Sequence, residues 1–217
     1  MKYELVIFDC DGVLVDSEGL SSQVFAEEIG KLGWDISAKE VLQRFKGGKF
    51  ADALAEIEAN ITQAMPADFE QLLRRRTFAA FEQELQPIPG IVEALDQLPL
   101  PFCVASNGPL NKIELNLGIT NLLSRFAERI FSAYELEIWK PDPSFYLTVA
   151  ERMGYAKETC LVIEDSYAGM QSATRAGIDV WVYAKEEVDH DIQQTGVPIF
   201  SNMSDLPGLI RSTTKVV

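Results

Sequence analysis

The chain has 217 residues, and 47% of them are hydrophobic, so it can bury a large core as one domain or as a domain with an insert. Its formal net charge of −14 argues against duplex nucleic acid and anionic membranes as partners, because both bind basic surfaces. It contains no apolar run of transmembrane length, and Met1-Lys2-Tyr3 leads directly into a predicted strand rather than into a signal peptide.

Two rare residue types narrow the chemistry further. The three cysteines, Cys10, Cys103 and Cys160, fall in strand-like segments and are predicted to be buried, reduced thiols of a cytoplasmic protein. The single histidine, His190, falls in the polar segment 186–191, which we predict to be a surface loop. A Ser-His-Asp triad, a phosphohistidine intermediate and a histidine-bound zinc are therefore disfavoured.

Strand-like and helical segments alternate along most of the chain. The predicted strands are residues 5–8, 102–106, 129–132, 160–164 and 180–183, with a weaker one at 199–200. Predicted helices follow Pro89-Gly90, open at Asp142-Pro143, and run from Asp165-Ser166 to Gly177. This alternation predicts an α/β fold, a doubly wound, Rossmann-like parallel sheet with helices on both faces and ligands beyond the carboxyl ends of its strands.

One long segment interrupts the alternation. Residues 17–86 contain helical hydrophobic patterns and no strand pattern. We therefore predict an α/β core domain of residues 1–16 and 87–217 and an inserted, all-helical cap domain of residues 17–86. The insert leaves the sheet at the end of the first strand, so it is expected to act as a lid with hinges near 15–16 and 87–89. The arginines at 74–76 are predicted to lie on a solvated helix face.

Polar groups follow the predicted strands where those strands end. Alternation along an extended chain places Asp9 and Asp11 on one side, where two like charges need a cation or a shared proton. Each group alone is typical of a turn or a helix cap, but their joint occurrence at one sheet edge predicts a site. The groups are Asp9-Cys10-Asp11-Gly12, Ser106-Asn107-Gly108, Lys140 in Trp139-Lys140-Pro141-Asp142, and Glu164-Asp165-Ser166.

These groups, in this order, resemble the four motifs of the haloacid dehalogenase superfamily. The tracts 8–18 and 164–169 are similar to the subfamily that includes β-phosphoglucomutase and sugar-phosphate phosphatases, which carries a helical cap where the insert lies here. Residues 45–49, 106–112 and 139–143 resemble the 6-phosphogluconate phosphatase branch. The resemblance implies a Mg²⁺-dependent phosphatase that acts on a small phosphorylated metabolite, such as 6-phosphogluconate, through an aspartyl-phosphate.

The resemblance also implies a role for each residue of the site. Asp9 would be the nucleophile, and Asp11 the general acid and base. The residues that would bind the phosphate are Ser106, Asn107 and Lys140. The Mg²⁺ ligands would be Asp9, the backbone carbonyl of Asp11, Asp165, and Glu164 through a water. The cap residues expected to read the substrate are Lys46, Gly47 and Lys49.

Three other functions stay open. A phosphosugar mutase is the nearest, but Ser21 and Phe50 stand where the mutases have a cap histidine and a cap arginine. A non-catalytic phosphosugar-binding protein is less favoured because all four motifs are intact. A phosphorylation-driven signalling receiver is disfavoured because the acid pair follows the first strand and precedes a large insert. A monomer is the default expectation.

Overall fold

The computed structural model describes residues 2–185 and 190–213 and has a six-stranded, all-parallel sheet with helices on both faces. The order of the strands across the sheet is β3-β2-β1-β4-β5-β6, so β1 lies in the middle. This arrangement confirms the predicted doubly wound α/β fold. The strands are β1 (Leu5–Phe8), β2 (Phe102–Ser106), β3 (Ile130–Ser132), β4 (Cys160–Glu164), β5 (Asp179–Tyr183) and β6 (Ile199–Phe200).

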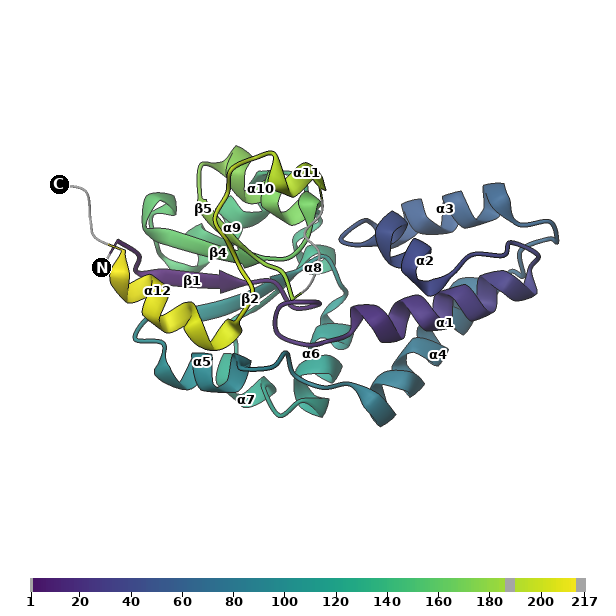
Figure 1. Ribbon diagram of the computed structural model, residues 1–217, viewed down its shortest axis with the longest axis horizontal. Coiled ribbons are helices and arrows are strands. Elements are labelled where there is room, and N and C mark those ends of the chain that lie inside the picture. Colours follow the sequence, from purple (N-terminus) through teal and green to yellow (C-terminus); the bar gives the residue numbers. More distant parts are fainter. Residues whose placement is uncertain (1, 186–189, 214–217) are drawn as a thin grey trace.

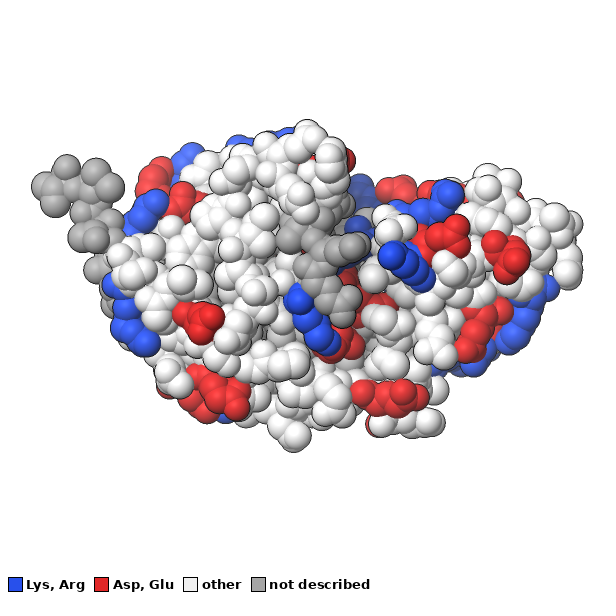
Figure 2. Space-filling view, in the orientation of Figure 1, with Lys and Arg blue, Asp and Glu red and all other residues white. Residues whose placement is uncertain are grey.

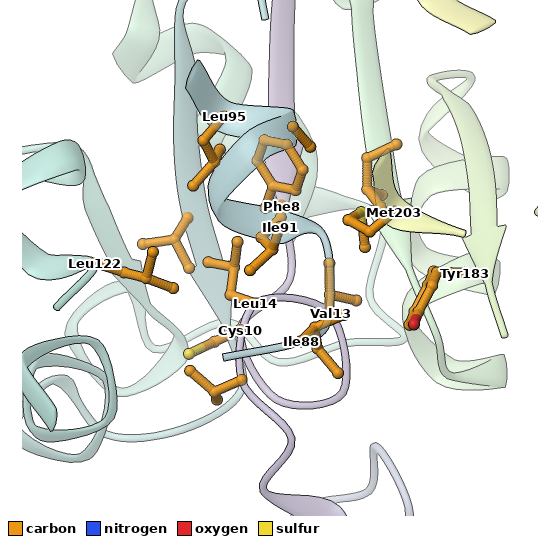
Figure 3. Close-up of a cluster of buried hydrophobic side chains, with 14 of the residues drawn as sticks. Phe8, Cys10, Val13, Leu14, Ile88, Ile91, Leu95, Leu122, Tyr183 and Met203 are labelled. Atoms are coloured by element: carbon orange, nitrogen blue, oxygen red, sulfur yellow. The ribbon is translucent and has the colours of Figure 1, made fainter. Parts of the chain in front are cut away.

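The central strand β1 is buried on both faces because its side chains alternate between two hydrophobic clusters. Val6 and Phe8 belong to one cluster, and Leu5 and Ile7 belong to the other. Figure 3 shows part of the first cluster, where side chains that follow β1 meet those of α5. The helices that contribute to the first cluster are α5 (Ile91–Gln97), α6 (Leu110–Ile119), α7 (Leu123–Phe126) and α12 (Leu206–Ser212), together with the end of α4 (Phe69–Glu84) through Phe81.

The second cluster covers the opposite face of the sheet. Phe145 and Tyr146, at the start of a helix that follows the third strand, are fully buried in it. The helices that contribute to it are α8 (Ala133–Leu136), α9 (Ser144–Met153), α10 (Tyr167–Ala176) and α11 (His190–Gln193). Short 3₁₀ turns, η1 (Lys157–Thr159) and η2 (Met203–Asp205), complete the described elements.

Four helices form a separate lobe beside the sheet (Figure 1). They pack around their own hydrophobic cluster, which includes Ile29, Ile57 and Leu73. A capping box at Ser37, whose hydroxyl accepts from the Glu40 N–H while the Glu40 carboxylate accepts from the Ser37 N–H, fixes the start of the second helix. The four helices are α1 (Glu18–Lys31), α2 (Ala38–Phe45), α3 (Phe50–Asn60) and α4 (Phe69–Glu84).

Two antiparallel linkers join this lobe to the sheet. Val15 and Pro87 form a bridge, the Asp16 N–H donates to the Gln86 carbonyl at 2.9 Å, and the Ile88 N–H donates to the Leu14 carbonyl at 3.0 Å. The chain therefore enters and leaves the helical lobe at one place. We propose residues 17–86 as the cap domain and these paired linkers as its hinge.

The charges are interleaved over both lobes. Figure 2 shows Lys and Arg side chains alternating with Asp and Glu on the face that it presents, without a continuous basic area. No helix among the described residues is both long enough and apolar enough to cross a membrane.

The structure corrects several predictions of local structure. Strands β3 and β5 begin at Ile130 and Asp179, one residue from the predicted starts. Cys10 lies after β1 rather than within a strand, although all three cysteines are buried and free as predicted. His190 is exposed, but it begins the short helix α11; the rest of the predicted loop at 186–189 lies outside the described residues. Helix α9 begins at Ser144, whose N–H donates to the Asp142 carboxylate at 2.8 Å.

Candidate active site

Asp9, Lys140 and Glu164 form a buried chain of ion pairs at the carboxyl edge of the sheet. Asp9 follows β1 and Glu164 ends β4, so these neighbouring parallel strands bring the two acids to the same edge. The Lys140 Nζ lies 2.6 Å from Asp9 Oδ1 and 2.6 Å from Glu164 Oε1. Because Lys140 is only 3% exposed, its charge acts in a region of low dielectric, where it is weakly screened.

Asn107 positions the backbone of Lys140. The Asn107 side chain accepts from the Lys140 N–H at 2.9 Å and donates to the Lys140 carbonyl at 3.3 Å. The preceding residue, Ser106, ends β2 and its buried hydroxyl accepts from the Gly108 N–H at 3.1 Å. The three residues predicted to bind a phosphate therefore lie together, beside Asp9.

Glu164 accepts hydrogen bonds at both carboxylate oxygens. The Tyr146 hydroxyl donates to Oε1 at 2.6 Å, beside Lys140, while the Ser166 hydroxyl and two backbone N–H groups donate to Oε2 at 2.9–3.2 Å. Burial alone would raise the pKa of Glu164, but Lys140 and these donors lower it below its usual value. Glu164 is therefore held as a carboxylate that orients Lys140.

Asp11 takes a different set of partners from Asp9. Strand β1 ends at Phe8, so Asp9 and Asp11 lie beyond it. The alternation of side chains along a strand therefore does not place them on one side, contrary to the prediction. The Asp11 carboxylate accepts from the Lys112 ammonium at 2.8 Å, from the Ser17 hydroxyl at 2.5 Å and from the Asn116 amide at 3.2 Å. Although burial acts in the opposite direction, Lys112 and these donors lower the pKa of Asp11.

Lys112 and Asn116 are site residues to which the sequence analysis assigned no role. They lie four residues apart on α6, so both side chains extend from the same face of that helix. That spacing could have identified both as candidate site residues, because α6 directly follows the Ser106-Asn107 group at the end of β2. Only the packing of α6 beside the first loop shows that this face meets Asp11.

Asp9, Glu164 and Asp165 could hold a metal ion, because their carboxylate oxygens lie within 4.8 Å of one another and all three are buried. Burial, together with the neighbouring acids, raises the pKa of Asp9 well above its usual value, although Lys140 opposes this. Burial and Glu18 likewise raise the pKa of Asp165 against the effect of a nearby lysine. The nearby lysines therefore do not fully offset the negative charges of Asp9 and Asp165.

The charge balance around the cluster fits a divalent cation. Among residues 2–185 and 190–213, five carboxylates of the cluster pair with three ammonium groups, an excess of two negative charges. Hard oxygen donors of this kind are the ligands that Mg²⁺ prefers. The carboxylates belong to Asp9, Asp11, Glu18, Glu164 and Asp165, and the ammonium groups belong to Lys46, Lys112 and Lys140.

The cap loop of residues 46–49 reaches into this cluster. The Lys46 Nζ lies 2.7 Å from Asp165 and 3.0 Å from Glu18. Gly47 has a φ of +68°, and a Cβ there would lie 2.6 Å from Ser166, so only glycine permits this close approach. The Gly47 carbonyl also accepts from Asn107 at 3.3 Å, which links the cap to the core.

Lys49, the third cap residue predicted to read the substrate, lies at the seam between the lobes. Its ammonium is 5.3 Å from the centre of the Trp139 ring of the core. Lys46 therefore faces the acidic cluster, whereas Lys49 faces the cavity between the lobes. That cavity has a volume of about 220 Å³.

The cavity is lined by residues of both lobes, including four that the sequence analysis did not select for the site: Phe25, Arg74, Thr77 and Phe78. The prediction that the arginines at 74–76 lie on a solvated helix face is wrong for Arg74. Arg74 lines the cavity, and Arg76 forms ion pairs with Glu27 and Glu28.

Gly169 is needed for close packing against Glu164. A Cβ at this helical position would lie 1.8 Å from Glu164 Oε1. We expect Gly169→Ala to lower the free energy of unfolding by roughly 1–3 kcal/mol through this clash, although alanine favours helices. Chemical denaturation measures the change. Gly118→Ala is the matched control, since nothing lies within 4 Å of a Cβ there, and equal effects of the two substitutions would contradict the argument.

The fold and the site together define an α/β enzyme with a separate helical lobe, in which an aspartate, a lysine and a buried acidic cluster meet at the sheet edge. The family model of the haloacid dehalogenase-like hydrolases matches residues 3–177. The chain therefore belongs to this family of hydrolases, and the predicted family is confirmed.

Relatives and solved structures agree with this assignment. The chain is 35% identical to 6-phosphogluconate phosphatase of Escherichia coli (strain K12) over 210 residues, which cover 96% of this chain and 95% of the relative. It is 30% identical to hexitol phosphatase B of the same organism, with 85% of each chain covered. A solved haloacid dehalogenase-like protein from Agrobacterium tumefaciens has a TM-score of 0.85 and 30% identity, with 97% of this chain and 98% of the other covered.

Proposed function

We propose that the protein is a Mg²⁺-dependent phosphatase that hydrolyses a small phosphorylated metabolite through an aspartyl-phosphate. The observation that carries this proposal is the buried Lys140, which lies 2.6 Å from Asp9 and beside the acidic cluster. A phosphomonoester dianion can approach an aspartate only where positive charge offsets both anions. Lys140 supplies part of that charge beside Asp9, and a divalent cation held by the uncompensated acids would supply the rest.

The proposed reaction has two steps. Asp9 attacks phosphorus, and the ester P–O bond breaks as Asp11 gives a proton to the leaving alkoxide. A water then attacks the aspartyl-phosphate, gives a proton to Asp11, and releases Asp9 and phosphate. Lys140 and the Ser106 hydroxyl offset the charge that develops on the phosphoryl oxygens. The contacts of Asp11 favour its carboxylate form, which is the form that accepts the proton of water in the second step, whereas the first step uses the protonated acid.

We propose that Asp9, the Asp11 carbonyl and Asp165 would hold Mg²⁺, with Glu164 acting through a water. When bound, the ion would neutralise charge between the nucleophile and the phosphate. Lys46 now contacts Asp165, so this lysine and the ion would share one carboxylate. Because the excess charge at the cluster is negative, the ion is expected to stabilise the fold as well as the reaction.

The finer part of the proposal is the substrate. Two relatives are named for phosphatases of phosphorylated sugar acids or sugar alcohols, and the more similar one is a 6-phosphogluconate phosphatase. We propose an acidic sugar phosphate such as 6-phosphogluconate. The three buried, free cysteines support a cytoplasmic location, and we propose a monomer.

The experiment that tests this function is phosphate release from a panel of sugar phosphates, with and without Mg²⁺. We expect turnover of acyclic six-carbon phosphates, and conversion of β-glucose 1-phosphate to the 6-phosphate would instead support the mutase. Ser21, at the place of the mutases' cap histidine, lines the cavity and favours the hydrolase.

Removal of the metal is a separate test. We expect treatment with EDTA to abolish phosphate release and added Mg²⁺ to restore it. Since the ion would bind the folded state only, Mg²⁺ should also raise the Tm of the metal-free protein, by roughly the equivalent of 2–3 kcal/mol at 100 times its Kd. Calorimetry and thermal denaturation measure the two effects. Full activity in EDTA would contradict the metal requirement.

A further inference from the structure

The basic side chains that line the cavity have two kinds of partner. Lys46, Lys112 and Lys140 each contact a carboxylate of the catalytic cluster. Lys49 forms no ion pair within 4 Å in the part of the chain that the structure describes, and Arg74 pairs only with a residue of the cap. Two cations in the cavity are therefore not committed to the reaction centre.

Arg74 is held in one orientation by its own lobe. Its Nε and Nη2 both approach the same oxygen of Glu70, at 3.0 and 2.9 Å, and its guanidinium carbon lies 4.3 Å from the centre of the Phe50 ring. A guanidinium has five N–H donors, and among the residues described no acceptor contacts Nη1. The pair with Glu70 is half exposed and therefore weak, so Arg74 keeps both charge and donors for another group.

The wall around Arg74 has the composition of a site for a polar carbon chain. Phe25 and Phe50 both line the cavity and supply apolar surface. Their rings meet edge to face, with 5.8 Å between the ring centres. Thr77, one turn after Arg74 on α4, also lines the cavity; it is only 6% exposed and its hydroxyl has no hydrogen-bond partner among the described residues. An unpaired hydroxyl at a buried position indicates a missing polar partner.

We propose that Arg74 is a specificity-determining residue that binds an anionic group at the end of the substrate remote from the reacting phosphate. Its ion pair with Glu70 and its contact with the Phe50 ring both lie in the helical lobe, whereas the reacting phosphate would lie at Lys140 in the core. The anionic group is a carboxylate or a second phosphate, and Lys49 adds positive charge at the seam. This inference rests on the proposed phosphatase function and adds the residue that selects the leaving group.

The test compares Arg74→Gln, Arg74→Lys and the matched control Arg75→Gln, which changes the exposed neighbouring arginine outside the cavity. The substrates are 6-phosphogluconate, glucitol 6-phosphate, which has the same carbon chain without the carboxylate, and fructose 1,6-bisphosphate. We expect Arg74→Gln to raise KM for the anion-bearing substrates roughly 10- to 100-fold, as for loss of a charged hydrogen bond, and KM for glucitol 6-phosphate less than threefold. Arg74→Lys should recover part of the loss. The substrate that loses most identifies the anion.

Binding is measured in parallel by calorimetry in the Asp9→Asn background, so the result does not depend on turnover. If no substrate is hydrolysed, the proposed phosphatase fails, yet selective loss of 6-phosphogluconate binding in Arg74→Gln still supports the inference. The inference is overturned if Arg74→Gln weakens the binding of charged and neutral ligands equally, or shows no selective loss of affinity. It is also overturned if Arg75→Gln weakens binding as well. Circular dichroism of each variant separates misfolding from these outcomes, and Arg74→Lys decides the case if Arg74→Gln does not fold.

Discussion

Asp9→Asn is expected to lower phosphate release by roughly 10⁴-fold or more, because an amide cannot act as the anionic nucleophile. The substitution keeps the shape of the side chain, and it leaves the neighbouring Lys140 ammonium in place. Loss of activity therefore reports on the nucleophile rather than on the surroundings. Rate measurement under saturating substrate, together with trapping of the phosphoenzyme by acid quench, checks the result.

The same substitution should leave the fold intact. Burial and neighbouring acids raise the pKa of Asp9, and an ionised group whose pKa is higher in the folded state than in the unfolded state favours unfolding. The Tm of metal-free Asp9→Asn should therefore equal or exceed that of the parent, while activity is lost. Asp35→Asn, at an exposed position, is the matched control and should change neither quantity. Retained turnover in Asp9→Asn would eliminate the covalent mechanism.

Lys140→Met is expected to give the largest loss of stability, roughly 3–5 kcal/mol, because it leaves buried carboxylates without their cation. Lys140 contacts Asp9 and Glu164 at 2.6 Å each, and Glu164 is fully buried. Phosphate release should also fall by at least about 10²-fold through loss of charge stabilisation. Denaturant unfolding and steady-state kinetics measure the two effects.

The stability effect should depend on pH. In the parent protein Lys140 holds the pKa of Glu164 low, so this ion pair stabilises the fold above the unfolded pKa and weakens only as the pH falls through the folded value. In Lys140→Met the buried acids would bind protons on folding, so the deficit should shrink between pH 7.5 and pH 5.5. The double variant Asp9→Asn/Lys140→Met should lose less free energy of unfolding than the sum of the two single effects. An additive, pH-independent loss would contradict a shared buried charge network.

Much of the fold was predictable because its signals are local. The runs at Leu5–Phe8 and Cys160–Glu164 are short and apolar and end in acids, and both are strands with the predicted bounds. The helical insert was visible as the only long segment without a strand pattern. Local signals were weakest at element ends, where β3 and β5 start one residue from their predicted positions and α9 starts after Pro143.

Which groups lie at the sheet edge could be predicted from local signals, because parallel strands end on one side and carry their following residues there. Asp9 and Asp165 directly follow β1 and β4 and obey that rule, whereas Lys140 lies beyond α8 and was predicted from motif order alone. The pairing of each lysine with its acid could not be predicted in this way: Lys112 contacts Asp11, and Lys46 reaches from the helical lobe to Asp165. These pairings depend on how whole helices and loops pack against one another, and no periodicity within one segment encodes that arrangement.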